Sequence, residues 1–317
     1  MVQVLKPEEV TDRYGRMFCR GVYTLVDERN GVAQVREECS ARGPVEWDAC
    51  NRKRAGGAMT KVTVEGNTII MDTIIGEGEV RFGPASKDLG GQGLRSLIVD
   101  GDKVRTTWVG LAGASVGIGA CLPQGPGTIS AEYPDEVHIG GAHQVEVTIV
   151  TPKLVRVIIA VDDTDTKQQG ASWSMVLKVA RECPVGTLLE HKIVQLNPNV
   201  PEKTTNCVSV GVSFAVREKD LPALLAYFKE ALRKNTFSQE TTMAYFVGLR
   251  IPKELEEYGW RAKSVIYNIG QAMDVASRNG VEVVEITGRR GTIGAVAAIG
   301  CFDLGVRAAG LPEDFES

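Results

Sequence analysis

This sequence of 317 residues has no excess of positive charge, few aromatic residues and no long apolar run. The formal net charge is −4, whereas a broad electrostatic grip on nucleic acid normally requires a basic domain or stripe. A small local basic patch is the most that this composition allows. No stretch approaches the ~18 apolar residues of a membrane helix, and the start, MVQVLKPEEV, lacks the basic and apolar regions of a signal peptide. We therefore expect a cytoplasmic protein that has no contact with a membrane.

Cysteine is present, but its spacing excludes two kinds of framework. The seven cysteines include no C-x-x-C pair, so the sequence predicts neither a zinc ribbon nor a disulfide framework. Free thiols in a reducing cytosol are expected. The rest of the composition, 43% hydrophobic and 24% charged with 35 glycines, is typical of a globular protein that is long enough for two domains.

The N-terminal half is expected to be rich in antiparallel strands. Alternating β-rich runs surround Glu65-Gly66-Asn67 and again Asp100-Gly101, which predicts two hairpins. The charged run at 36–57 instead predicts a loop or mobile surface. Its NRKRAGG end is either a solvated basic loop or a phosphate contact.

Two further features of this half carry little chemistry. The glycines of GLAGASVGIGA, at 110–120, match no complete dinucleotide fingerprint and favour close packing. His138 and His143 have no third metal ligand nearby in the sequence. Two successive strand-like runs are separated at Pro152, which predicts a domain boundary there. We therefore expect an N-terminal β-rich domain at 1–152 and a second domain at 153–317.

The second domain is organised around VRVIIAVDDTDTKQQG, at 155–170. Its apolar run predicts a strand buried on both faces, and three carboxylates crowd the end of that strand: Asp162, Asp163 and Asp165, with Thr164 between them. Carboxylates this close repel one another unless a cation lies among them, and Mg²⁺ completes such a shell with waters and phosphate oxygens. The pattern indicates a metal and phosphate site. The alternative is that these residues only turn the chain and cap the next helix.

Periodicity beyond this point predicts a helix at 171–181, strands at 188–196 and 207–216, and an amphipathic helix at 218–234. This order opens a ferredoxin-like or split βαβ layer, so the fold class is α+β. Because a helical crossover makes the first two strands parallel, the loop after residue 196 should emerge beside the three carboxylates.

That loop, LNPNVPEKTTN, is stiffened by two prolines and carries groups suited to a phosphate chain. They are amides, a cation and compact donors: Asn197, Asn199, Lys203, Thr204, Thr205 and Asn206.

A third element, TGRRGTIGAVAAIG, follows the last predicted strand. Gly288 and Gly291 flank Arg289 and Arg290, and a small-residue helix starts at Gly291 or Thr292. Free N–H groups at such a start bind anions, and tight packing of a glycine-alanine helix is the alternative.

In this order, AVDDTDT with the downstream Gly170, LNPNVPEKTTN and GRRGTIGAVAAIG resemble the kinase-like catalytic domain of the archaeal tRNA-Ile agmatinylcytidine synthetase. The resemblance covers roughly residues 153–305. Across the whole chain, the sequence is similar to methanogenesis marker protein 11.

In the synthetase, this domain binds ATP and Mg²⁺ and activates a cytosine by phosphorylation. The resemblance implies that Asp162, Asp163 and Asp165 bind metal and act in catalysis, with Lys203 and Thr204 near phosphate.

Two departures accompany the resemblance. Trp173 and Ser174 stand where the family has a Thr-Thr pair, so we expect no threonine autophosphorylation there. We predict that Thr164, Gly170 and Ser174 contact the nucleotide. The tRNA-reading zinc ribbon has no counterpart in the cysteine spacing, so we do not expect tight tRNA binding.

We therefore expect an ATP·Mg²⁺-dependent phosphoryl- or nucleotidyl-transferring enzyme in a methanogenesis-associated modification, maturation or assembly step. The alternative is a non-catalytic nucleotide-binding sensor or assembly protein that keeps the pocket without turnover. Besides the nucleotide, the partner would be an acceptor such as a protein of the methanogenesis pathway. A homo-oligomer is compatible with the sequence.

Overall fold

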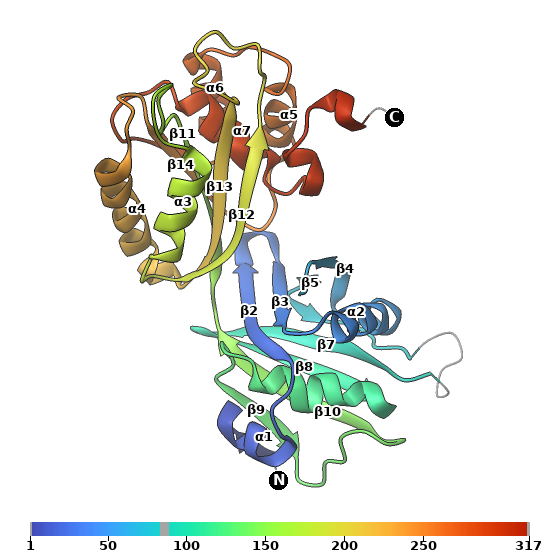
Figure 1. Ribbon diagram of the computed structural model, residues 1–317. Helices are drawn as coiled ribbons and strands as arrows, with labels where there is room; N and C mark the ends of the chain where they lie inside the picture. The colour runs from blue at the N-terminus through green and yellow to red at the C-terminus, as the bar shows by residue number, and fades with distance from the viewer. Residues whose placement is uncertain (1, 83–88, 316–317) are drawn as a thin grey trace. The chain divides into compact units, whose positions relative to one another are not determined.

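The computed structural model describes residues 2–82 and 89–315, and the chain divides into two compact units, Met1–Leu154 and Val155–Ser317 (Figure 1). Each unit has its own sheets and its own apolar core. No helix in the described parts of the chain is long and apolar enough to cross a membrane.

The C-terminal unit contains an antiparallel sheet with the strand order β12-β13-β11-β14-β15. Its strands are β11 (Val155–Asp162), β12 (Thr187–Gln195), β13 (Val208–Val216), β14 (Thr242–Val247) and β15 (Val281–Glu285). Its α-helices are α3 (Ser172–Arg181), α4 (Leu221–Asn235), α5 (Lys253–Arg261), α6 (Ile269–Arg278) and α7 (Thr292–Cys301). The first four strands have the ferredoxin-like order, and β15 extends it at one edge. The expected α+β fold class is confirmed.

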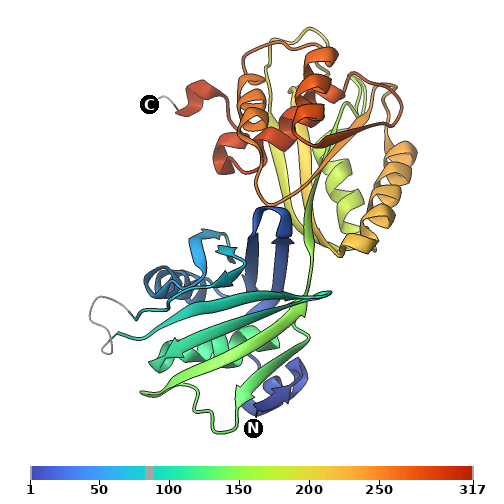
Figure 2. The same ribbon diagram turned by 180° about the vertical axis from the view of Figure 1, so that it is seen from behind.

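Strand β11 lies at the centre of this sheet and is buried on both faces, as expected. Val157, Ile159 and Val161 pack into the core under α3 and α4. Ile158 and Ala160 pack into the opposite core, which α5, α6 and α7 cover (Figures 1 and 2). The unbroken apolar run follows from this double burial, because neither face of the strand meets water.

The N-terminal unit contains two antiparallel sheets, with the strand orders β1-β9-β10-β8-β7-β6 and β2-β3-β5-β4. The six strands of the first are β1 (Val2–Leu5), β6 (Gly76–Glu77), β7 (Gly91–Asp100), β8 (Lys103–Leu111), β9 (Ser130–Pro134) and β10 (Gln144–Pro152). The four strands of the second are β2 (Cys19–Asp27), β3 (Val32–Cys39), β4 (Met59–Glu65) and β5 (Thr68–Ile74). The described residues of this unit also form the helices α1 (Pro7–Tyr14) and α2 (Arg42–Ala55).

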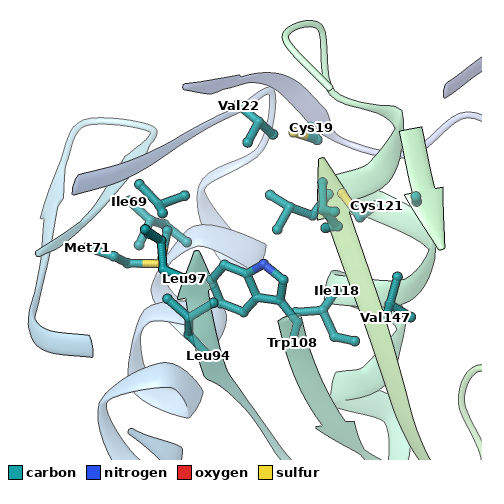
Figure 3. Packing of buried hydrophobic residues seen from close by; sticks show 14 of the residues in the cluster. Cys19, Val22, Ile69, Met71, Leu94, Leu97, Trp108, Ile118, Cys121 and Val147 are labelled. Atoms are coloured by element: carbon teal, nitrogen blue, oxygen red, sulfur yellow. The ribbon is translucent and has the colours of Figure 1, made fainter. Parts of the chain in front are cut away.

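The core of this unit is built around Trp108, which is fully buried (Figure 3). Its ring lies among apolar side chains of both sheets, and its Nε1 donates to Thr106 Oγ1 at 3.0 Å. Both expected hairpins are confirmed: β4 turns into β5 at Gly66, and β7 into β8 at Gly101, each glycine with a left-handed φ near 60°.

The prediction of a loop at 36–57 is wrong, because this stretch forms the end of β3 and all of α2. Two of its charges are buried: the guanidinium of Arg52 is fully buried, pairs with Glu37 at 2.6 Å and lies 5.1 Å from the centre of the Trp108 ring. NRKRAGG is therefore a helix end with a buried arginine. Close packing is confirmed at Gly110, Gly117 and Gly119 of GLAGASVGIGA, since a Cβ on Gly117 would approach Gln92 Nε2 to 2.7 Å, whereas a Cβ on Gly113 would meet nothing within 4 Å.

Candidate functional site

A cavity of about 590 Å³ opens at the carboxyl end of β11. Its walls come from the end of β11, the loop after β12, the connection between α5 and α6, and the start of α7. The polar side chains that line it are Asp162, Asp163, Asn197, Glu202, Lys203, Asn268 and Arg290. The apolar side chains and thiol that line it are Leu196, Val200, Cys207, Ala262, Val265, Ile266, Tyr267, Ile269 and Ile293. The lining of the cavity thus combines charged and apolar side chains.

Two helix N-termini meet at this cavity. Ile269 and Gly270 belong to the first turn of α6, and Ile293 and Gly294 to the first turn of α7. Each helix start carries a partial positive charge from the aligned peptide dipoles, and backbone N–H groups there favour anions. Both positive helix ends therefore face the same cavity.

Asp162 lies against the start of α7 because two glycines permit the approach. The Oδ2 atom of Asp162 occupies the space that a Cβ on Gly294 would need, and a Cβ on Gly291 would lie 2.7 Å from Asp162 O. Burial, and then repulsion from Asp163, raise the pKa of Asp162 well above its usual range. A cation in the cavity would favour the ionised form.

Asp163 follows with a left-handed backbone, φ 55°, and its side chain faces Arg290. Arg290 donates from Nε to Oδ2 at 2.9 Å and from Nη2 to Oδ1 at 3.3 Å. This hydrogen-bonded carboxylate raises the pKa of Arg290 further.

The loop after β12 reaches the third carboxylate, as the predicted topology requires. Thr204 Oγ1 donates to Asp165 Oδ1 at 3.1 Å, which joins two loops 39 residues apart in sequence. Burial raises the pKa of Asp165, and this hydrogen bond opposes the rise. Lys203 lines the cavity and donates from Nζ to Pro198 O at 2.5 Å. The expected meeting of the two segments is confirmed.

Several residues that were predicted to contact the nucleotide instead form contacts with neighbouring parts of the chain. Thr164 is 2% exposed, and its hydroxyl donates to Ser172 Oγ at 2.9 Å. Ser174 Oγ donates to Ala171 O at 3.1 Å. Gly170 has a left-handed φ of 93°, and a Cβ there would lie 2.8 Å from the Phe237 ring. These positions shape the loop beside the carboxylates.

The amides of the second loop also brace the backbone. Asn197 Nδ2 donates to Ser264 O at 3.0 Å, and its Oδ1 accepts from the N–H of Asn199 at 2.9 Å. Asn206 O accepts from Gln195 Nε2 at 2.8 Å, and Thr205 is exposed.

The turn before α7 differs from the expectation of free N–H groups. The N–H groups of Arg289 and Arg290 both donate to Glu240 Oε2, at 3.3 and 3.2 Å, so they are not available to an anion. Thr292 is buried, and Arg289 pairs with Glu285 at 2.7 Å. Of the two arginines, Arg290 is the one whose side chain lines the cavity.

The alternative that the carboxylates cap the next helix is wrong. Helix α3 begins after Ala171, and among the described residues no side chain caps its first turn.

The wall formed by residues 262–270 was not predicted from the sequence. It includes Ile266 and Tyr267, which belong to none of the three motifs. Asn268 starts α6 with a reciprocal cap, in which Asn268 Oδ1 accepts from the N–H of Gln271 and the Gln271 side chain accepts from the N–H of Asn268, both at 2.9 Å. The N-x-x-Q spacing was the available signal for this helix start.

Two acidic side chains of the lining fit a hard cation. Asp162 and Asp163 offer carboxylate oxygens to the cavity. Within residues 2–82 and 89–315, no group of three His, Cys, Asp or Glu side chains is placed to hold a metal ion. Two carboxylates with water and phosphate oxygens are the shell that Mg²⁺ usually takes.

Comparison with known proteins identifies relatives of the whole chain and of its C-terminal part. Uncharacterized protein MJ0921 of Methanocaldococcus jannaschii is 33% identical over 304 residues, which cover 94% of this chain and 98% of that protein. The model of the TiaS TCKD domain matches residues 158–222. The tRNA 2-agmatinylcytidine synthetase TiaS of Thermococcus sibiricus is 32% identical over 154 residues, 46% of this chain and 35% of the enzyme.

A crystal structure of TiaS with its tRNA and ATP superposes on 46% of this chain and 36% of its own, with a TM-score of 0.41 and 22% identity. This chain therefore spans about a third of the length of the TiaS proteins. The predicted resemblance to the synthetase is confirmed for part of the C-terminal unit, and the resemblance to marker protein 11 stays a prediction.

Proposed function

This chain belongs to the family of MJ0921 of Methanocaldococcus jannaschii, and we propose that its C-terminal unit binds ATP with Mg²⁺ and transfers a phosphoryl or nucleotidyl group. The observation that carries the proposal is the distribution of charge around one cavity. Asp162 and Asp163 face it together with Lys203, Arg290 and two helix N-termini. Phosphoryl transfer depends on such positioned charge more than on covalent chemistry.

The apolar side chains of the lining suit the base of the nucleotide, and Val265, Ile266 and Tyr267 come from one stretch of the chain. Burial, and then the nearby Asp162 and Asp163, raise the pKa of the Cys207 thiol to about 11, so that thiol is neutral. A volume of about 590 Å³ lies within the range of sites that enclose small ligands.

Each polar residue has a separate task in this proposal. Asp162 and Asp163 would hold Mg²⁺, which supplies charge neutralisation at the phosphates when it is bound. Lys203 and Arg290 would contact phosphate oxygens, and Thr204 keeps Asp165 and the second loop in place. The similarity to TiaS, a synthetase by name, supports nucleotide-dependent transfer.

The acceptor is proposed from the sequence. Similarity to methanogenesis marker protein 11 suggests a modification, maturation or assembly step of methanogenesis, with a protein of that pathway as one acceptor. Tight tRNA binding is not part of the proposal, because the chain has a net charge of −4 and spans 35% of the T. sibiricus TiaS protein.

A non-catalytic nucleotide-binding protein is the second candidate. The hydroxyl of Thr164 donates to Ser172 at the start of α3, and that of Ser174 donates to Ala171 O, so neither hydroxyl is free to carry a phosphate, which favours a pocket that binds without a protein-linked phosphate step. The two candidates differ in turnover.

Purified protein with millimolar ATP and Mg²⁺ tests both. Binding to the folded state should raise the melting temperature, since ligand at 100 times Kd adds about 2.7 kcal/mol of stability. Release of ADP or AMP above the buffer rate, abolished by EDTA, supports the enzyme. Binding without release supports the second candidate, and a melting temperature that does not respond to ATP and Mg²⁺ contradicts both.

A further inference from the structure

Arg290 holds one of the two carboxylates that face the cavity. Its Nε and Nη2 donate to the two oxygens of Asp163, at 2.9 and 3.3 Å. The pair is accessible, because the Arg290 side chain is 37% exposed and both residues line the cavity. A forked contact of this kind neutralises the carboxylate and uses lone pairs that a cation would need.

The backbone on both sides of this pair is anchored by residues 240 and 241. The N–H of Arg290 donates to Glu240 Oε2 at 3.2 Å, and that of Gly291 to Glu240 O at 3.1 Å. Thr241 Oγ1 donates to Asp163 O at 2.7 Å. The guanidinium is therefore able to change its partner by side-chain rotation while the two backbones stay in place.

We propose that Arg290 exchanges partners when the nucleotide and Mg²⁺ bind, leaving Asp163 for phosphate oxygens while the carboxylate passes to the metal. The inference rests on the proposed function and adds a regulatory step to the same site. Arg290 then opposes binding of the metal ion alone and contacts the metal-nucleotide complex.

Charge explains both effects. A bare divalent cation has to displace the guanidinium from Asp163 and then lies beside a like charge, which disfavours binding. The nucleotide brings phosphate oxygens that accept the released guanidinium, and planar bidentate contact with phosphate is the geometry that arginine favours. The exchange therefore ties metal binding to the presence of nucleotide.

Binding of Mn²⁺, used as a probe for Mg²⁺, tests the exchange by electron paramagnetic resonance and calorimetry without a turnover assay. We expect Arg290→Gln to bind Mn²⁺ alone about fivefold more tightly than the wild type and Mn²⁺·ATP about tenfold more weakly. Arg290→Lys keeps the charge but loses the fork, so both of its affinities should lie between those of the wild type and Arg290→Gln.

Arg289→Gln is the matched control. The Arg289 side chain is 58% exposed and pairs with Glu285, so both affinities should stay within about twofold of the wild type. Circular dichroism establishes whether each variant is folded. If Arg290→Gln does not fold, the affinities of Arg290→Lys are compared with those of the wild type instead.

Opposite changes in the two affinities support the exchange, because a general loss of structure would lower both. If the wild type binds Mn²⁺·ATP but the Arg290 variants bind Mn²⁺ alone no more tightly than the wild type, the exchange is contradicted. The proposed function is not contradicted by that result. If the wild type does not bind Mn²⁺·ATP, the proposed function is contradicted and the exchange with it.

Discussion

The carboxylate of Asp162 fills the space where a side chain on Gly294 would lie. The carboxylate therefore lies directly beside the first turn of α7, at the positive end of the helix dipole. Glycine inside a helix costs about 1 kcal/mol relative to alanine, so helix formation alone does not explain Gly294. The space that the Asp162 carboxylate takes up explains why this position has no side chain.

Gly294→Ala should separate folding from binding. The added methyl would overlap Asp162 and lie 3.2 Å from Leu196 Cδ1, so the carboxylate has to move, while alanine favours the helix by about 1 kcal/mol. We expect a melting temperature within about 5 °C of the wild type and an affinity for ATP·Mg²⁺ lowered about tenfold or more, measured by calorimetry.

The control is Gly43→Ala in α2, where nothing lies within 4 Å of an added Cβ, and its affinity should be unchanged. Wild-type affinity in Gly294→Ala would show that the placement of Asp162 does not matter for binding.

The raised pKa of Asp162 predicts a pH dependence with a definite sign. In the ligand-free protein, the folded state keeps a proton that the unfolded chain loses. The free energy of unfolding should therefore fall as the pH rises from the ordinary aspartate pKa toward the raised value. Asp162→Asn removes this group, so its melting temperature should fall less over the same range. Equal pH dependence in the two proteins would contradict the assignment.

Binding should show the opposite trend, because the metal requires the ionised carboxylate. Affinity for ATP·Mg²⁺ should rise with pH through the raised pKa of Asp162, and a proton should be released. Calorimetry in buffers of different ionisation enthalpy measures that proton. No pH-dependent release would mean that Asp162 is already ionised in the ligand-free protein.

The parts of the site that could be predicted are those fixed by local pattern and strand topology. The apolar run of β11 identified a doubly buried strand, because each of its faces meets a helix layer. The crossover rule then predicted that the loop after β12 emerges beside the carboxylates, where Thr204 contacts Asp165. The three clustered carboxylates were visible as a local charge pattern.

The parts that could not be predicted depend on distant partners. Arg52 belongs to a run of polar residues, and only its contacts with Glu37 and Trp108 make it a core residue. Similarly, Glu240 meets the N–H group of Arg290 across 50 residues. No periodicity in the sequence encodes such a contact, so the turn before α7 looked open to anions when it is already occupied.

The buried pair in the N-terminal unit gives a prediction about stability. Glu37 and Arg52 are both fully buried and lie 2.6 Å apart, so Arg52→Met leaves a buried carboxylate without its cation. We expect a loss of about 3–5 kcal/mol in the free energy of unfolding of that unit, measured by urea denaturation.

The double variant Glu37→Met/Arg52→Met should recover part of this loss, since it removes both charges of the pair but leaves the buried Asp48 without the nearby guanidinium. Folded Arg52→Met should keep wild-type affinity for ATP·Mg²⁺, because the proposed site lies within the other unit. Wild-type stability in Arg52→Met would contradict the buried pair.

The central claim is that the carboxylates at the end of β11 bind a nucleotide through Mg²⁺. The most direct test is the calorimetric affinity for ATP, with Mg²⁺ and with EDTA, of the wild type and Asp162→Asn. An amide is a poorer ligand for a hard cation than a carboxylate, but it is similar in shape. We predict that Mg²⁺ strengthens ATP binding by the wild type about tenfold or more, and that folded Asp162→Asn loses most of this gain. ATP binding that ignores Mg²⁺ in the wild type, or an undiminished gain in Asp162→Asn, would contradict the claim.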